Sequence, residues 1–266
     1  MKKNGTPRSA ARITRPHRDR FYYGWRYVER RGPNGEKGVE QVPLTLEDVL
    51  HPQEDDVIPE SSLHNDERTY LKYILEPRLA RLKRARVFSD CLINWGVPGL
   101  RNHSLDISAF DRIAEPHRQW NTFPAGQQGA RCLFVVELVS PKTRRNDLKR
   151  KPPEYHQAGV PLYIIVDQKE EDGPRRLLAY RNTPAGFVPE PLDERGRVLL
   201  KPLGVLLGLR DNRVVCYDAK TGEEIRDYTG ETQARQAAEA RLRELEAEMR
   251  RLRGAKKPAR KKRRSS

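Results

Sequence analysis

The sequence predicts an α/β protein with a mixed central sheet flanked by helices, followed by a separate C-terminal helix. Short apolar runs bounded by Gly, Pro, Asn and Asp alternate with segments whose apolar residues recur at helical spacing. Hydrophobic residues make up 36% of the 266 residues and charged residues 33%, so a real core shares the chain with very polar segments. No apolar run approaches the roughly 18 residues of a membrane span, and the basic N-terminus lacks an apolar signal region. We therefore expect a cytoplasmic protein with no membrane partner.

The net charge of +15 is concentrated at the two ends of the chain. Residues 1–20 hold seven Lys/Arg and one Asp, and residues 251–266 hold nine Lys/Arg and no acid, so the chain between them is formally neutral. We expect disordered basic arms at 1–20 and 255–266. Such arms bind phosphate without reading sequence, and salt weakens that binding. DNA is therefore the expected partner, and tails that only solubilise the protein are the alternative.

Residues 21–60 are predicted to form an N-terminal extension that packs on the core. The extension opens with an aromatic segment at 21–27. A short helix follows within 43–52, with Thr45 as its N-cap and Asp48 reaching back three residues later.

The main domain is expected at residues 61–228. It opens with a helix over 64–84 that Pro77 should kink. Buried strands are predicted at 86–95, 105–110, 132–140 and 161–168, with a helix within 146–158 that ends at Gly159. Antiparallel strands and hairpins are predicted at 175–181, 197–202, 204–218 and 222–228.

Residues 229–254 are predicted to form one charged helix with a narrow apolar seam that ends at Gly254. The seam residues alternate at spacings of four and three: Ala238, Leu242, Leu245, Met249 and Leu252. This pattern is typical of a coiled coil, which would give a homodimer. Docking on the chain's own domain is the alternative.

One acid, Glu137, lies inside an apolar run that includes Val135, Val136, Leu138 and Val139. Such a run is typical of a buried strand, where a carboxylate is costly unless a cation contacts it. The cation is either a side chain or a metal ion.

Asp106 lies in the preceding predicted strand, and the two acids can point to one end of the sheet. Converging carboxylates repel each other and raise a pKa unless a divalent ion neutralises them. Mg²⁺, which binds one or two carboxylates and keeps several waters, fits this pair, with Mn²⁺ as a substitute.

Asp147 and Lys151 are four residues apart, so they share a face if they lie on one helix. Carboxylates and a lysine around Mg²⁺ are what phosphodiester hydrolysis requires, because the reaction needs an activated water and stabilised negative charge. On spacing alone, a structural ion pair between Glu137 and Lys151 or an arginine remains the other interpretation. Prolines suit the first turn of a helix, so a helix that starts at about Pro152 would leave Lys151 in the preceding turn. In that case Lys149 is the alternative catalytic lysine.

An ordered set of motifs connects these residues. It comprises Asp106, Glu137, Ser140-Pro141-Lys142-Thr143, Asp147, Lys151, Tyr155, Ala158-Gly159-Val160-Pro161 and Tyr163 to Asp167. Over about residues 61–220 the sequence resembles the Uma-two family, restriction-endonuclease-like proteins of the PD-(D/E)xK nuclease fold. The family usually has a proline before the first acid, where this chain has Leu105.

The resemblance implies that Asp106 and Glu137 are metal ligands and that the Leu138 carbonyl is a third. It also implies that Lys151 serves as the catalytic lysine, moved from the strand to the helix, because Val139 occupies the strand position.

Three other residues are weaker candidates. His64 could contact a metal-bound water or phosphate, but such a histidine more often caps or packs a helix. Asp90 is expected to face solvent or lie at an edge. Ser140 lacks the Gly-x-Ser-x-Gly elbow of a nucleophile and is expected to leave the strand in a turn.

The sequence therefore predicts a Mg²⁺-dependent endonuclease that hydrolyses DNA phosphodiester bonds. A catalytically inactive nucleic-acid-binding or scaffold protein, which uses the basic arms and the terminal helix, is the alternative.

Overall fold

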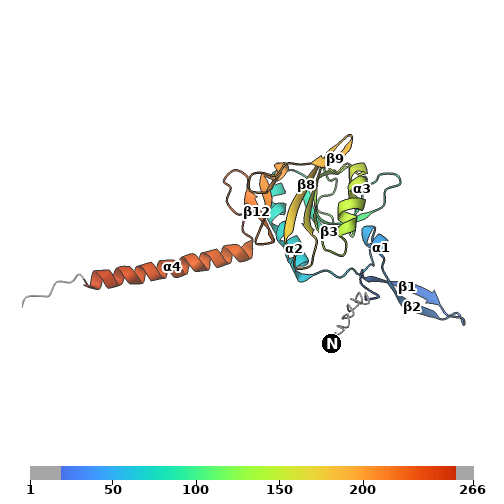
Figure 1. The fold of residues 1–266 in the computed structure, drawn as a ribbon, viewed down its shortest axis with the longest axis horizontal. Helices are drawn as coiled ribbons and strands as arrows, with labels where there is room; N and C mark the ends of the chain where they lie inside the picture. Colours follow the sequence, from blue (N-terminus) through green and yellow to red (C-terminus); the bar gives the residue numbers. More distant parts are fainter. Residues whose placement is uncertain (1–18, 256–266) are drawn as a thin grey trace, which may run out of the picture.

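The computed structural model describes residues 19–255 (Figure 1), so the basic segments predicted at 1–20 and 255–266 lie almost entirely outside the described residues. Its strands are β1 (Trp25–Arg31), β2 (Lys37–Pro43), β3 (Arg86–Asn94), β4 (His103–Asp111), β5 (Thr122–Pro124), β6 (Arg131–Leu138), β7 (Leu162–Gln168), β8 (Arg175–Thr183), β9 (Gly186–Pro189), β10 (Val198–Leu200), β11 (Val205–Arg210) and β12 (Arg213–Asp218). Its helices are α1 (Leu46–Leu50), α2 (Ser62–Leu79), the π-helical turn η1 (Asn146–Arg150), α3 (Lys151–Gln157), the 3-10 turn η2 (Lys201–Leu203) and α4 (Tyr228–Ala255).

A seven-stranded mixed sheet with the order β5-β3-β4-β6-β7-β8-β9 forms the centre of the domain. β3 pairs with β5 and β6 with β7 in parallel, and the other neighbours are antiparallel. A three-stranded sheet, β10-β11-β12, and a two-stranded ribbon, β1-β2, complete the strands of the described chain. The predicted fold class, a mixed sheet flanked by helices with a C-terminal helix, is confirmed.

Alternation along the buried strands gives the sheet two cores. In β6, Phe134 and Val136 pack in the core that contains α2, whereas Val135 packs in the core that contains α3. By the same alternation Glu137 lies on the α3 side. Figure 1 shows the two helices with the sheet between them. Each fully buried Phe or Leu contributes about 1.5–3 kcal/mol to these cores.

The predicted core strands are observed within a few residues of their expected bounds, and three elements differ from prediction. The segment 222–228 is not a strand: only an isolated bridge joins Glu224 to Tyr217, because a turn at Asp218 and the start of α4 leave too few residues for a ladder. The strand predicted at 197–202 is cut short by η2, which holds Pro202. Pro77 lies in the last turn of α2, so the helix stops at Leu79 instead of kinking and continuing.

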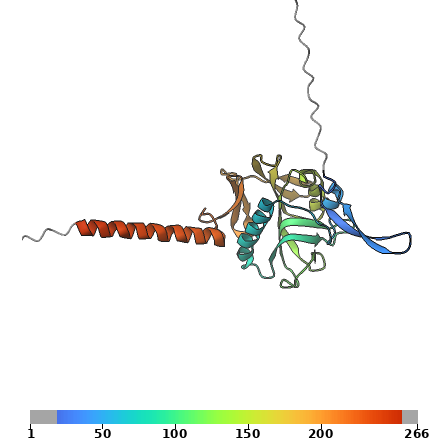
Figure 2. The ribbon, with the colours of Figure 1, turned by 90° about the horizontal axis from the view of Figure 1, so that it is seen from below.

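The N-terminal extension contains a hairpin that the sequence did not predict. The aromatic segment 21–27 leads into β1, and β1 and β2 project from the domain instead of packing on it (Figure 2). The short helix α1 is confirmed, with a capping box between Thr45 and Asp48.

The helix that carries the predicted lysine begins at Asn146, so the alternative start at Pro152 is wrong. The Lys151 N–H donates to the Asn146 carbonyl in a π-type bond, and α3 continues from there. Pro152 and Pro153 have no N–H and leave carbonyls of the preceding turn without a helical donor, and the Asp147 carbonyl accepts the Tyr163 hydroxyl at 3.0 Å instead. Asp147 and Lys151 therefore share a face.

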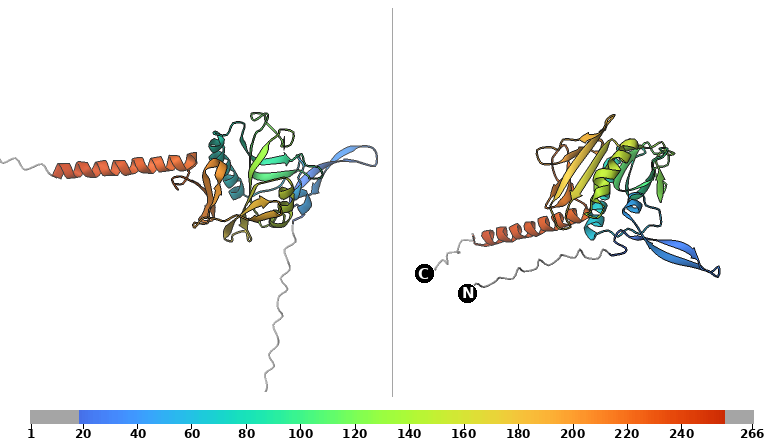
Figure 3. Two further views of the ribbon diagram at one scale, coloured as in Figure 1. Left: turned by 90° about the horizontal axis from the view of Figure 1, so that it is seen from above. Right: turned by 45° about the vertical axis from the view of Figure 1, so that its right-hand side comes forward.

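The helix α4 extends away from the domain in every view (Figures 1 and 3), so the predicted alternative of docking on its own domain is wrong. Leu242, Leu245 and Met249 are 58%, 44% and 52% exposed. None of the described helices is both long and apolar enough to cross a membrane.

Candidate active site

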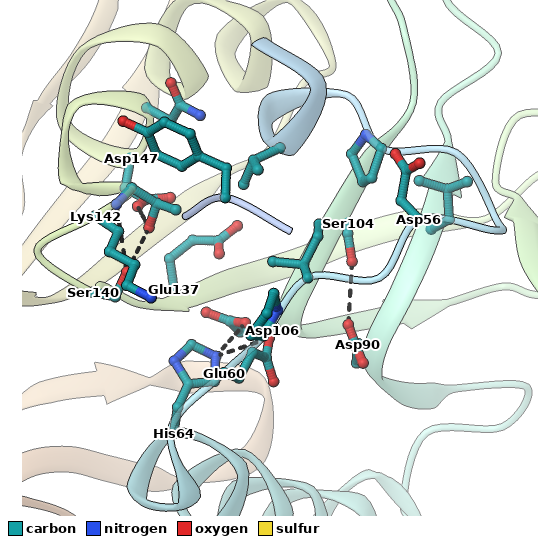
Figure 4. Close-up of a pocket in the computed structure, with 18 of the residues that line it drawn as sticks. Asp56, Glu60, His64, Asp90, Ser104, Asp106, Glu137, Ser140, Lys142 and Asp147 are labelled. Carbon is teal, nitrogen blue, oxygen red and sulfur yellow. Dashed lines mark hydrogen bonds and ion pairs between the residues drawn. The ribbon is translucent and has the colours of Figure 1, made fainter. Parts of the chain in front are cut away.

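A cavity of about 580 Å³ lies between the N-terminal extension and the central sheet (Figure 4). Tyr22 and Tyr23 form part of one wall, and the ammonium of Lys142 lies 4.9 Å from the centre of the Tyr22 ring. The residues predicted to carry function meet in the lining: Asp106, Glu137, Leu138, Asp147 and Lys151.

Glu137 is buried and both of its carboxylate oxygens are hydrogen-bonded. The Tyr155 hydroxyl donates to Oε1 at 2.6 Å, and the Lys151 ammonium lies 3.0 Å from Oε2. Burial, with the nearby charges of Asp106 and Asp147, raises the pKa of Glu137 to about 8, although Lys151 opposes this shift.

Lys151 bridges two acids, because its ammonium is also 2.8 Å from Asp147 Oδ1. Burial disfavours the ammonium, but the charges of Asp147 and Glu137 outweigh burial and raise the pKa of Lys151 well above its usual range. Lys151 is therefore a fixed cation at neutral pH and cannot serve as a general base. Tyr163 holds the same turn by donating to the Asp147 carbonyl at 3.0 Å.

Asp106 lies on β4, beside β6, and its two oxygens are also engaged. Oδ1 is 2.9 Å from His64 Nε2, and Oδ2 accepts the Leu138 N–H at 2.8 Å. Although burial favours its neutral form, His64, Lys151 and the Leu138 N–H hold the pKa of Asp106 at about 2.

His64 reaches Asp106 from the first turn of α2, which Ser61 caps (Figure 4). Burial disfavours its charge, but Asp106 and Glu60 raise the pKa of His64 to about 9, so the ring is protonated at neutral pH. The sequence left open whether His64 caps a helix or has a function. In the structure His64 contacts Asp106, a predicted metal ligand.

Comparison with known proteins assigns the chain to a family. Residues 55–222 match the sequence profile of the Uma2 family, described as "Putative restriction endonuclease". The chain belongs to this family. No curated protein matches the chain. A solved structure described as "a putative nuclease" from Anabaena variabilis ATCC 29413 is similar at 17% identity and a TM-score of 0.39, over 59% of this chain and 74% of that one.

Membership in the Uma2 family confirms the predicted resemblance and indicates an endonuclease-type hydrolase, whose substrate class is nucleic acid. The roles of individual residues and the division into domains stay predictions. Of the two candidate lysines, Lys151 lines the cavity, whereas Lys149 is exposed and is not part of the described lining.

Two weaker candidates are placed as predicted, because Asp90 is exposed and Ser140 lies where the chain leaves β6. Asp90 lines the cavity, and its carboxylate contacts Ser104 and Arg68 at 3.3 Å each. Its backbone has a φ of 49°, the left-handed region that Asp tolerates better than most residues. The Ser140 hydroxyl lies 3.1 Å from the Thr143 hydroxyl, which fits the predicted turn that leaves β6.

Sequence reasoning missed several residues that hold the site. Tyr155 entered only as a family motif, yet it contacts Glu137 directly. Arg68 lies on α2 and contacts Glu60 at 2.8 Å and Asp90 at 3.3 Å. One signal was available: His64 and Arg68 are four residues apart, which puts them on one face of the predicted helix.

The described chain contains two groups of His and carboxylate donors whose atoms lie within 4.8 Å of one another: Glu60, His64 and Asp106, and His51, His103 and Glu154. The second group does not fit a metal. The Trp95 indole N–H donates to His103 Nδ1 at 2.9 Å, so the neutral ring carries its proton on Nε2, which faces Glu154 at 2.6 Å. No lone pair of His103 remains for an ion.

Proposed function

We propose that this Uma2 family protein is a metal-dependent endonuclease that hydrolyses phosphodiester bonds in DNA. The observation that carries the proposal is the position of Lys151, held between Glu137 and Asp147 in a cavity that Asp106 also lines. Carboxylates provide ligands for a hard cation, and a fixed ammonium beside them provides charge stabilisation for a pentavalent phosphorane.

The donor set fits a divalent ion. Three buried or largely buried carboxylates, of Asp106, Glu137 and Asp147, share this region with Lys151 and His64, and the pKa of Glu137 is raised by its burial and by the charges of Asp106 and Asp147. Asp106, Glu137 and the Leu138 carbonyl are the groups that would hold Mg²⁺ or Mn²⁺, because both ions prefer oxygen ligands. When bound, the ion would activate a water and neutralise phosphate charge.

The protein's own groups have distinct roles in this proposal. Lys151 keeps its proton and stabilises the negative charge that grows on the phosphoryl oxygens as the attacking oxygen bonds to phosphorus and the bond to the leaving oxygen breaks. Tyr155 fixes the orientation of Glu137 through the 2.6 Å hydrogen bond. His64, protonated and bonded to Asp106, orients that carboxylate and carries a proton at the cavity wall.

A second candidate function rests on the same contacts. Both oxygens of Glu137 are already satisfied by Tyr155 and Lys151, as they would be in a purely structural ion pair. The protein would then be an inactive DNA-binding or scaffold protein.

Nicking of a supercoiled plasmid separates the two functions. We expect nicking with Mg²⁺ or Mn²⁺, none with EDTA, and a loss of at least about two orders of magnitude in Glu137→Gln. A wild-type protein that binds the plasmid but never nicks it with either ion would contradict the nuclease and favour the scaffold.

We also infer a parallel homodimer through α4. With Leu242 and Met249 at heptad position a and Leu245 at d, Arg241 of one copy faces Glu246 of the other in a parallel pair. The exposed seam supports this pairing. Sedimentation of the full chain should show a dimer that Leu245→Asp dissociates, whereas a monomeric wild type at high concentration would contradict it.

A further inference from the structure

The root of the β1–β2 ribbon is fixed to the wall of the catalytic cavity. Tyr22 and Tyr23 line the cavity, and β1 begins two residues later with Trp25, which pairs with Val57. The Arg26 guanidinium then donates to Asp56 at 2.8 Å and to Asp48 at 2.9 Å. These charge-assisted bonds tie the ribbon to the segments that form the cavity wall, so its direction relative to the site is set.

The other end of the ribbon projects away from the domain (Figures 1 and 2). Seven residue pairs join the strands, which at about 3.4 Å per residue span roughly 24 Å. A two-stranded ribbon of this kind fits the DNA major groove, which is about 12 Å wide and 8.5 Å deep.

The two faces of the ribbon differ in chemistry. Because paired residues share a face and alternate along each strand, the register separates two sets. The first set, here called the reading face, contains Tyr27, Glu29, Arg31, Lys37, Val39 and Gln41. The second, the back face, contains Val28, Arg30, Gly38 and Glu40 beyond the anchored root.

The reading face carries groups that recognise base edges. Arg31, Lys37 and Gln41 offer hydrogen-bond donors, and Tyr27 and Val39, which are 60% and 69% exposed, offer apolar contact to a thymine methyl. On the back face, by contrast, the Arg30 guanidinium is already paired with Glu40 at 3.0 Å.

One pair on the reading face is unfavourable without a partner. Arg31 lies directly opposite Lys37, and like charges directly opposite each other destabilise a two-stranded ribbon; with Glu29 as the one acid on this face, the two cations still give it a net positive charge. A polyanion removes this cost. Residues 1–20, which hold seven Lys/Arg, directly precede the root of the ribbon in the sequence.

We infer that the reading face of the β1–β2 ribbon inserts into the major groove of duplex DNA and positions the duplex beside the cavity. This inference rests on the proposed function, because it takes DNA as the substrate. The ribbon would supply sequence or shape preference, and the basic segments would supply affinity without preference.

A charge-matched pair of neighbouring residues tests the inference. Arg31→Ala and Arg30→Ala each remove one cation from the same strand, but only Arg31 lies on the reading face. Binding of the full chain to a labelled duplex, measured by fluorescence anisotropy in EDTA, should weaken about tenfold in Arg31→Ala and less than about threefold in Arg30→Ala. Dimethyl sulfate, which methylates guanine N7 in the major groove, should find protected guanines with wild type and Arg30→Ala but not with Arg31→Ala.

The outcomes separate this inference from the proposed function. Equal losses in the two variants, or no protection of guanine N7, would overturn the ribbon's role even if the protein cleaves DNA. The predicted difference between the variants, seen in a protein that never cleaves, would support the ribbon while removing the nuclease. If Arg31→Ala leaves DNA affinity unchanged and dissociates a dimer in sedimentation, the ribbon joins two copies and the inference is wrong.

Discussion

His103 should make the stability of the protein depend on pH, and the size of the effect follows from its surroundings. The ring is completely buried, and its Nδ1 accepts the Trp95 indole N–H at 2.9 Å while its Nε2 faces Glu154. A proton added to Nδ1 would meet the indole N–H. Burial, with the charges of Lys151, His51 and Arg101, lowers the pKa of His103 to about 2.

The unfolded chain has no such restraint, so its histidine takes up a proton below about pH 6.5. The folded state does not take up this proton, so stability from His103 is present above about pH 6.5 and is lost as the pH falls toward 2. Between pH 7 and pH 5 this one residue should cost about 2 kcal/mol of unfolding free energy, since each pKa unit corresponds to about 1.4 kcal/mol.

Urea unfolding followed by circular dichroism at pH 7 and pH 5 measures this difference. His103→Gln should be less stable than wild type at pH 7 by about 1–3 kcal/mol, because Trp95 or Glu154 loses a good partner. Its stability should change by about 2 kcal/mol less than that of wild type between the two pH values. The matched control is His117→Gln at an exposed position, which should keep the wild-type pH dependence. An identical pH dependence in His103→Gln and wild type would refute the buried, neutral ring.

Three further predictions concern the site and the basic tail. Lys151→Ala should lower the single-turnover cleavage rate by about two orders of magnitude or more with little change in DNA affinity, whereas Lys149→Ala should retain most activity; the reverse pattern would show that the wrong lysine is assigned. Asp106→Asn should bind Mn²⁺ weakly or not at all in calorimetric titration, and affinity equal to wild type would remove the metal site. Deleting residues 254–266 should weaken DNA binding across all sequences and reduce the salt slope by about 0.9 for each phosphate that the tail neutralises, so an unchanged slope would leave the tail as a solubiliser only.

The order of the core elements and the site carboxylates could be predicted because burial leaves a clear pattern in the sequence. Glu137 is conspicuous as an acid among apolar residues, and its strand could only be a buried one. Asp106 could be predicted as the second carboxylate because it lies in the preceding strand and can point to the same end of the sheet as Glu137. These arguments depend on alternation and cost of burial, which are local properties of the chain.

Whether Lys151 lies on the helix or in the turn before it could not be settled from the sequence. The answer depends on a π-type hydrogen bond, which joins residues five positions apart instead of four. Two prolines indicated a helix start, and α-helical rules alone would place Lys151 before that start. The π-type bond from Lys151 to Asn146 joins η1 to α3 instead. The contacts of Arg68 and His64 were also hidden, since they join α2 to strands more than twenty residues away.

The β1–β2 ribbon escaped prediction for a different reason. Its strands do not alternate between buried and exposed residues, because most of the ribbon contacts no core. At its root, Trp25 pairs with Val57, and Arg26 contacts Asp48 and Asp56. The sequence does not indicate these tertiary contacts, because the partners lie more than twenty residues further along the chain.

The charges of the cavity explain why binding and chemistry should reside in different parts of the chain. Acidic residues outnumber cations in the described lining even without Glu137, whose pKa is raised to about 8. The acids are Glu54, Asp55, Asp56, Glu60, Asp90, Asp106 and Asp147, and the cations are His64, Lys142 and Lys151. An approaching phosphate is repelled by such a lining unless a metal ion accompanies it, so the cavity itself contributes little to DNA affinity. Affinity then has to come from other cations of the chain, which the sequence concentrates in the basic terminal segments and the ribbon also carries. It follows that loss of the tail should raise the DNA concentration needed for half-maximal rate while the maximal rate stays near wild type. Loss of Lys151 should lower the maximal rate while the DNA concentration needed for half-maximal rate stays near wild type.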